Sequence, residues 1–139
     1  MAEAQGKGRP VARPLAPHLQ IYRWPITMGT SILHRITGVG LSAGTLLLAW
    51  WLVAVSMGPD AYIQFADIAS GWFGRLVLFG FTLALVYHAM NGIRHLLWDA
   101  GIGLTLKSAN SSGLAVYVLS IITTLLIWVA AYQSMGAWQ

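Results

Sequence analysis

Residues 72–98 read WFGRLVLFGFTLALVYHAMNGIRHLLW, an almost uninterrupted apolar run. It is longer than the roughly 20 apolar residues that a helix needs to cross the hydrocarbon core of a bilayer. Because a segment in lipid must satisfy its own backbone hydrogen bonds, we expect it to be an α-helix. Two more apolar stretches, at about 28–57 and 114–135, meet the same condition. The sequence therefore predicts an all-α membrane protein with three transmembrane helices.

The composition of the 139 residues also indicates a lipid environment. Apolar residues make up 57% of the chain and charged residues 9%, whereas roughly 25% of the residues in soluble domains are charged. Only four residues are acidic, which leaves few carboxylates for hydrolytic acid–base chemistry. Cysteine is absent, and this excludes disulfides, iron–sulfur clusters and covalently attached c-type haem on this chain.

The basic residues predict the direction in which the chain crosses the membrane. Four of them lie in a polar segment, 1–27, which lacks the apolar region of a secretory signal. The first connection, 58–71, contains no Lys or Arg, and the second contains Lys107. Since cytoplasmic segments are enriched in these residues, we expect a cytoplasmic N-terminus, a three-helix domain over 28–139 and a C-terminus outside. Arg75, near the outer end of the second helix, is the exception.

This charge pattern and the short polar segment favour the inner membrane of a bacterium, with the mitochondrial inner membrane as the alternative. Turn-forming residues separate the three helices. Gly58 and Pro59 are expected to end the first, because glycine is a common C-cap and proline cannot continue a helix. Segment 99–112 joins the other two, and either Ser111 or Ser112 is the expected N-cap of the third.

Ionisable side chains inside the apolar stretches are candidates for function, because a charged group costs roughly 2.5–3.5 kcal/mol to insert. The first helix contains His34 and Arg35, and Ser31 shares a helix face with Arg35. Arg35 can donate hydrogen bonds to a haem propionate or a quinone oxygen, and Ser31 to a quinone carbonyl. In the alternative interpretation, Arg35 reaches back to the membrane interface and Ser31 bonds to its own helix.

His88 begins a second polar face. His88, Gly92, His95 and Asp99 are spaced at i, i+4, i+7 and i+11, which places them on one side of the second helix. Imidazole is a common axial ligand of haem iron. Gly92 removes side-chain bulk beside His88, as a flat macrocycle would require. The alternative for His88 is an interhelical hydrogen bond.

Arg94 and His95 lie where the second helix is expected to reach the lipid headgroups, and we interpret them mainly as interfacial anchors. Proton relay to a reduced quinone by His95 or Asp99 is the alternative. At about 1.5 Å of rise per residue, Arg35 and His88 both fall in the cytoplasmic half of the membrane. We therefore expect these two side chains to share one cavity.

The chain contains three segments with a recognisable pattern: RPLAPHLQIY at 13–22, SILHRITG at 31–38, and Tyr87-His88 followed by Gly92-Ile93-Arg94-His95-Leu96 and Asp99. In this order, the three segments resemble the large cytochrome b anchor subunit of succinate dehydrogenase. The similarity extends from about residue 9 to the end of the third helix, which itself has no specific motif.

The resemblance implies a role in a complex that oxidises succinate at a flavin and reduces ubiquinone beside two membrane anchors. It implies that His88 is an axial ligand of haem b iron, and that the second axial ligand comes from the smaller anchor. Ser31 and Arg35 match quinone-binding positions, and Arg35 and His34 match positions near the haem propionates. Trp24 matches, less closely, an aromatic residue near the quinone entrance.

The partners implied are a flavoprotein subunit, an iron–sulfur subunit, the smaller membrane anchor and the lipid bilayer, with no nucleic acid. The chain is expected to have no catalytic residue for succinate oxidation and no activity alone. Three alternatives remain: the anchor of a fumarate reductase, a purely structural anchor without haem, and a transporter subunit. The transporter is disfavoured because the sequence has no inverted repeats or broken helices.

Overall fold

The structure is a computed structural model that describes residues 22–136. Residues 1–21 and 137–139 lie outside the described part of the chain. The predictions made on the first of the three similar segments, and on most of the N-terminal polar segment, therefore remain predictions.

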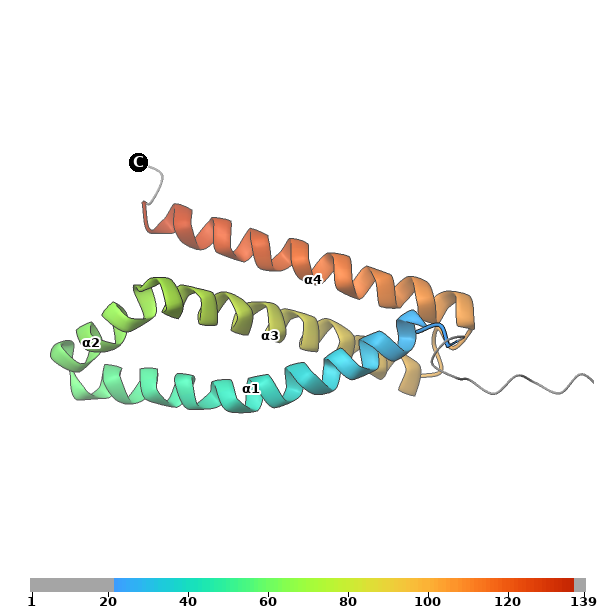
Figure 1. Cartoon of the computed structure of the whole chain (residues 1–139), viewed down its shortest axis with the longest axis horizontal. Helices are drawn as coiled ribbons and strands as arrows, with labels where there is room; N and C mark the ends of the chain where they lie inside the picture. The colour runs from blue at the N-terminus through green and yellow to red at the C-terminus, as the bar shows by residue number, and fades with distance from the viewer. Residues whose placement is uncertain (1–21, 137–139) are drawn as a thin grey trace, which may run out of the picture.

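Four α-helices make up the described residues, and three of them are long and apolar enough to cross a membrane by length and composition. These three are α1 (Ile26–Met57), α3 (Trp72–Asp99) and α4 (Leu106–Ser134). The fourth, α2 (Pro59–Ser70), is short and lies at one end of the bundle, between α1 and α3 (Figure 1). The predicted all-α architecture with three spans is confirmed.

The connection between α1 and α3 is helical, whereas we predicted a loop. Gly58 ends α1, as predicted, with a φ of 103°, a left-handed value that glycine adopts readily. Pro59 then takes the first position of α2, where its missing N–H costs no helical hydrogen bond. The rings of Phe65 and Trp50 pack edge to face with their centroids 4.8 Å apart, and this contact holds α2 against α1. This helix depends on tertiary packing, which residue spacing does not show.

The start of α4 also differs from the prediction. The helix begins at Leu106, about two turns early, and its N-cap is Thr105, whose side chain accepts a hydrogen bond from the N–H of Ser108 at 3.2 Å. The predicted caps, Ser111 and Ser112, lie inside the helix and donate to carbonyls three residues back. We expected the polar residues at the start of α4 to form a loop, because serine and asparagine side chains often favour turns over a helix. Packing against neighbouring helices, which this preference does not take into account, places them in α4.

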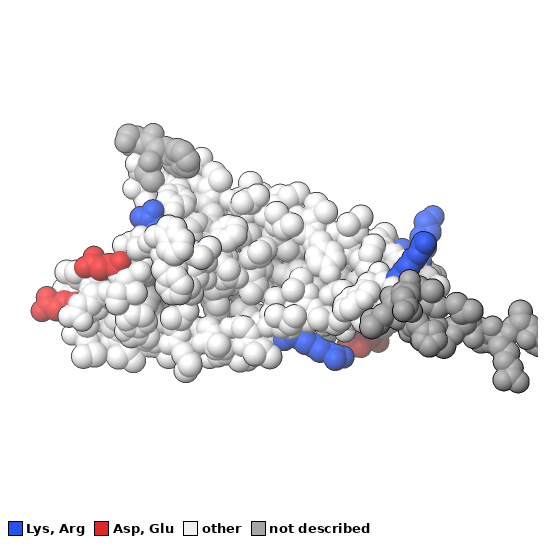
Figure 2. All heavy atoms as spheres, viewed as in Figure 1, with Lys and Arg blue, Asp and Glu red and all other residues white. Residues whose placement is uncertain are grey.

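The bundle buries small polar side chains and exposes apolar ones. Its largest fully buried side chains are Asn91, Thr30, Thr124 and Ser120, while Leu46 is 73% exposed. A soluble protein has the opposite pattern. In a membrane, lipid tails solvate apolar side chains and small polar groups connect the helices. Figure 2 shows a wide uncharged surface between the two ends of the bundle, as lipid or neighbouring membrane chains require.

Close approach of the helices depends on glycine at two positions. At Gly44, the ring of Phe81 from α3 fills the space where a side chain would lie, so a Cβ there would overlap the ring. At Gly113 of α4, a Cβ would lie 3.0 Å from Ile26 Cγ2 and 3.4 Å from Thr30 Cγ2, both on α1. Small residues therefore allow α1 to pack against both α3 and α4.

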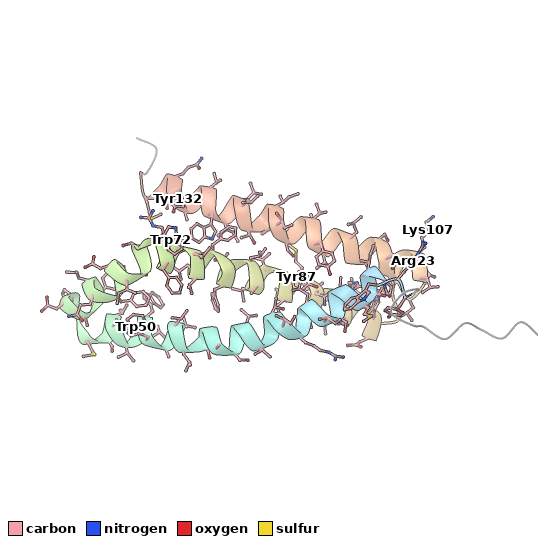
Figure 3. All side chains as sticks on the ribbon, viewed as in Figure 1. Arg23, Trp50, Trp72, Tyr87, Lys107 and Tyr132 are labelled. Carbon is pink, nitrogen blue, oxygen red and sulfur yellow. The ribbon has the colours of Figure 1, made fainter. Side chains whose placement is uncertain are left out.

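The two ends of the bundle differ in charge. Arg23 and Lys107 lie at the end where α1 begins and where α3 connects to α4 (Figure 3). The opposite end carries α2, whose charged residues are Asp60 and Asp67 (Figure 2). Tyr132 lies at that second end, as an aromatic residue at a membrane interface does (Figure 3).

Candidate functional site

Three histidines meet between α1 and α3, in the half of the bundle where α1 begins. The ring of His34 stacks on that of His88, with centroids 3.9 Å apart and planes 13° from parallel. The ring centroid of His95 lies 5.4 Å from that of His34. All three side chains are partly buried. We refer to His34, His88 and His95 as the histidine cluster.

Thr37 contacts the cluster from α1. Its Oγ1 lies 3.2 Å from Nδ1 of His88. The same oxygen lies 2.9 Å from the carbonyl oxygen of Leu33 and 3.0 Å from that of His34. Polar contacts between helices in lipid restrict how the helices face each other. Thr37 therefore helps to set the position of the His88 ring relative to α1.

Two glycines determine the space around His88. A Cβ at Gly38 would lie 3.2 Å from Cε1 and 3.8 Å from Nδ1 of His88, so the absence of a side chain lets this edge of the ring approach α1. Gly92 lies one turn after His88, and a Cβ there would meet nothing within 4 Å. The surface of α3 beside His88 is therefore bare, as the sequence predicts.

The histidine face of α3 is distinct from its most buried face. Tyr87, Asn91 and Arg94 are only 3%, 0% and 4% exposed, and their spacing of i, i+4 and i+7 aligns them. Each of His88 and His95 follows one of these residues directly and is only partly buried. The histidines therefore lie at the edge of the bundle, where another chain or a ligand can reach them.

Arg94 is buried, so our interpretation of it as an interfacial anchor was wrong. Its guanidinium donates to Thr30 Oγ1 on α1 at 3.0 Å. It also donates to Ser112 Oγ at 3.0 Å and to the carbonyl of Ala109 at 2.9 Å, both on α4. A fourth bond reaches Asn91 Oδ1 in its own helix at 3.2 Å. Because acceptors from α1 and α4 surround it, Arg94 connects the three spans instead of reaching the headgroups.

Thr30 lies at the centre of this network and was missed from the sequence. Its backbone carbonyl accepts a hydrogen bond from the hydroxyl of Tyr87 at 2.9 Å, and its own hydroxyl donates to the carbonyl of Thr27 at 2.9 Å. Figure 3 shows Tyr87 midway along the bundle. The available signal was a polar residue within an apolar stretch, but that alone did not distinguish Thr30 from Ser31.

The predicted quinone residues are less enclosed than the histidines. Ser31 is partly buried, Arg35 is exposed, and Trp24 is 64% exposed just before α1. His34, not Arg35, lies against His88. The described residues therefore bring His34 and His88 together but do not enclose Arg35 and His88 in the shared cavity that we expected, because consecutive residues of a helix point in different directions.

Cavity size does not identify this site. One cavity of about 470 Å³ lies at the opposite end of the bundle, between α2, α3 and α4, and Arg75 and Tyr132 are among its lining residues. Another, of about 260 Å³, lies beside Thr37 and Tyr87. Neither is lined by any of the predicted site residues. The site therefore has to be recognised from its chemistry.

Comparison of the amino-acid sequence with known families finds a matching profile. The profile described as the succinate dehydrogenase/fumarate reductase transmembrane subunit matches residues 9–127, which is most of the chain. The chain belongs to this family. The resemblance inferred from three short segments is thereby confirmed.

Within the succinate dehydrogenase/fumarate reductase family, the similar proteins include bacterial and mitochondrial subunits. The succinate dehydrogenase cytochrome b556 subunit of Paracoccus denitrificans is 44% identical over 114 residues, covering 82% of this chain and 88% of that protein. The b556 subunit of Rickettsia felis is 44% identical over 117 residues, covering 84% and 91%. The mitochondrial b560 subunit of Bos taurus is 38% identical over 122 residues, covering 85% and 71%.

Proposed function

We propose that the chain is the haem b-binding membrane-anchor subunit of a succinate dehydrogenase and helps to form its quinone-reduction site. The observation that carries the proposal is His88, an imidazole on a membrane-spanning helix that stacks on His34 and contacts Thr37. Imidazoles in such positions ligate haem iron. The relatives named above are all cytochrome b subunits of succinate dehydrogenase, which favours this enzyme over the fumarate reductase alternative.

The side chains around His88 fit a haem. Nδ1 of His34 is buried and has no hydrogen-bond partner among the described residues. Such unpaired buried nitrogens are rare in proteins, and a haem propionate would supply the missing partner. The bare surface at Gly92 leaves room for a flat macrocycle beside His88. The site therefore offers a ligand nitrogen, a propionate partner and space, all at the edge of the bundle.

A second axial ligand is expected from the smaller membrane anchor. His88 would be the ligand that this chain provides, whereas His34 stacks its ring face on the ring face of His88. His34 is therefore poorly oriented to share the same iron. Within α4 no histidine is present, so that span offers no alternative. The partly exposed position of His88 is consistent with a haem held between two chains.

Haem b, when bound, supplies a centre that accepts and donates single electrons. The residues of this chain bind and orient it: His88 provides the ligand nitrogen, and His34 and Thr37 restrict the orientation of the ring. The surrounding apolar helices exclude water, and this influences the reduction potential of a metal centre. Oxidation of succinate itself requires the flavoprotein and iron–sulfur partners, so we expect no activity from this chain alone.

Ser31, Arg35 and Trp24 are proposed to bind the quinone head. Arg35 would donate to a quinone oxygen from its guanidinium, and the Ser31 hydroxyl would donate to a carbonyl. Because Arg35 and Trp24 are exposed on the described chain, the site is completed by a partner, and the iron–sulfur subunit is the one that must deliver electrons there.

The end of the bundle that carries Arg23 and Lys107 is proposed to face the cytoplasm of a bacterial cell. The support is the excess of basic residues at this end and the acidic pair, Asp60 and Asp67, at the other. The quinone residues of α1 then lie near the cytoplasmic surface, where a soluble iron–sulfur subunit can reach them.

The quinone assignment is tested by comparing two activities of the purified complex. In Arg35→Ala and Ser31→Ala variants, succinate-driven reduction of ubiquinone should fall roughly tenfold, the effect expected when a hydrogen bond to the substrate is lost, while reduction of a water-soluble dye at the soluble subunits persists. The matched control is Arg75→Ala, which removes an exposed arginine from the opposite end of the bundle and should leave both activities intact. If both activities fall together in an assembled Arg35→Ala complex, the assignment is wrong.

A further inference from the structure

The hydroxyl of Thr37 has three possible hydrogen-bond partners but only one hydrogen to donate. Its Oγ1 lies within hydrogen-bond distance of the Leu33 carbonyl, the His34 carbonyl and Nδ1 of His88. A hydroxyl has one hydrogen to donate and two lone pairs that accept. The contacts with the carbonyl oxygens require that hydrogen, because a carbonyl oxygen can only accept.

Backbone carbonyls are the usual acceptors for hydroxyls in membrane helices. In the same helix, the hydroxyl of Thr45 donates to the carbonyl of Ser42. If Thr37 likewise donates to its own helix, its lone pairs face Nδ1 of His88. The 3.2 Å contact is then a hydrogen bond in which the Nδ1–H of His88 donates to Thr37 Oγ1.

We propose that Thr37 is a positioning residue that fixes the tautomer of His88 with the hydrogen on Nδ1, leaving Nε2 as the nitrogen that binds iron. This inference rests on the proposed haem ligation by His88. A neutral imidazole carries one ring hydrogen, so the partner of one nitrogen decides which nitrogen is free to bind a metal. Histidine ligands of metals generally have such a partner on their second nitrogen.

The packing around His88 also favours the orientation in which Nδ1 faces Thr37. Gly38 lets the Nδ1–Cε1 edge of the ring approach α1, since a Cβ at this position would lie 3.2 Å from Cε1. His34 covers one face of the ring at a centroid distance of 3.9 Å. With one edge turned to α1 and one face covered, a flip of the ring, which would exchange Nδ1 with Cδ2 and Nε2 with Cε1, requires the ring to leave its contacts. Gly38 and His34 therefore restrict the orientation of the ring, and Thr37 fixes its tautomer.

Removal of the acceptor has a measurable consequence for haem. Partners of this kind raise the basicity of the ligand, and their loss typically lowers metal affinity roughly 10–100-fold. A lower basicity of the imidazole destabilises ferric iron more than ferrous iron. Loss of the Thr37 acceptor should therefore weaken haem binding and raise the haem reduction potential.

The experiment uses the assembled complex carrying Thr37→Val, Thr37→Ser or Thr45→Val. Valine keeps the shape of threonine but cannot accept a hydrogen bond, whereas serine keeps the hydroxyl. Haem affinity is measured by titrating haemin into haem-depleted complex, and the potential by a spectroscopic redox titration. We expect Thr37→Val to lose roughly 10–100-fold in affinity and to shift the potential upward, and Thr37→Ser to match the wild type. Thr45→Val also loses a hydroxyl-to-carbonyl bond of α1 and should match the wild type.

An unchanged affinity and potential in Thr37→Val would overturn the inference. Equal losses in Thr37→Val and Thr45→Val would also overturn it, because the effect would then come from the helix backbone. If Thr37→Val does not assemble, the potential and affinity of Thr37→Ser and Thr37→Ala decide: the alanine variant alone should deviate. Failure of the proposed function is distinguishable, since His88→Ala would then retain haem with wild-type affinity.

Discussion

The guanidinium of Arg94 on α3 donates a hydrogen bond to the hydroxyl of Thr30 on α1 at 3.0 Å. The same group reaches Ser112 and the carbonyl of Ala109 on α4. All three spans therefore meet at one buried cation, which directly precedes His95 and lies one to two turns after His88 along α3. The network fixes the packing of α1 against α3, and this packing brings Thr37 and His34 to His88.

Substitution of Arg94 by leucine should destabilise the bundle. At about 0.6 kcal/mol for an average interhelical hydrogen bond in a membrane, the three bonds to α1 and α4 amount to about 2 kcal/mol. Thermal dissociation of the purified complex should occur at a lower temperature. Lysine should not restore stability, since a single ammonium cannot reproduce the fork of the guanidinium. Arg75→Leu is the control at an exposed position, and an equal loss there would refute the role of the buried network.

The contact between Gly44 and Phe81 predicts a second stability effect. Gly44→Ala should destabilise the complex by about 1–3 kcal/mol, because the added methyl group overlaps the ring of Phe81. Gly40→Ala, on the same helix, should be tolerated since a Cβ there meets nothing within 4 Å. A smaller side chain in Gly44→Ala/Phe81→Leu should recover part of the loss. If Gly40→Ala and Gly44→Ala lower the temperature of thermal unfolding equally, the close approach of Gly44 and Phe81 is contradicted.

The orientation of the chain can be tested by single-cysteine labelling, because the natural sequence has no cysteine. Asp67→Cys in α2 and Lys107→Cys in the first turn of α4 are exposed positions at opposite ends of the bundle. In intact spheroplasts, a membrane-impermeant maleimide should label Asp67→Cys and spare Lys107→Cys, and inside-out vesicles should give the reverse. The opposite pattern would place the N-terminus outside.

The three spans could be predicted because lipid imposes a simple requirement on sequence: a long apolar stretch with internally satisfied hydrogen bonds. The short helix Pro59–Ser70 could not be found in this way. It lies at the end of the bundle and depends on contacts such as that between Phe65 and Trp50, which connect residues from different elements.

The part of the candidate site that lies on one face of α3 could be predicted from the sequence. The spacing of His88, Gly92 and His95 indicated their common face on α3. The contacts from α1, by contrast, depend on the rotation of one helix relative to another. The estimated depths in the membrane favoured Arg35 as the neighbour of His88, whereas His34 and Thr37 lie there in the structure. Arg94 was misread for the same reason, since its acceptors lie on α1 and α4.

Loss of His34 gives a further prediction. In His34→Phe, an aromatic ring can still stack on His88, but the nitrogen proposed to meet a propionate is gone. Haem should remain bound with lower affinity, and His34→Ala, which also removes the stacking ring, should bind it more weakly still. Haem content per assembled complex, measured as the pyridine haemochrome, checks this order. Equal haem content in both variants and the wild type would show that His34 has no part in the site.

The most direct test of the central claim is the reduced-minus-oxidised visible spectrum of the purified complex carrying His88→Ala, beside the wild type and His95→Ala. If His88 ligates haem iron, the wild type and His95→Ala show the absorption band of a low-spin b haem, and His88→Ala loses it although the subunits still copurify. An assembled His88→Ala complex with an unchanged b-type spectrum would contradict the account. A wild-type complex without any haem band would favour a purely structural anchor instead.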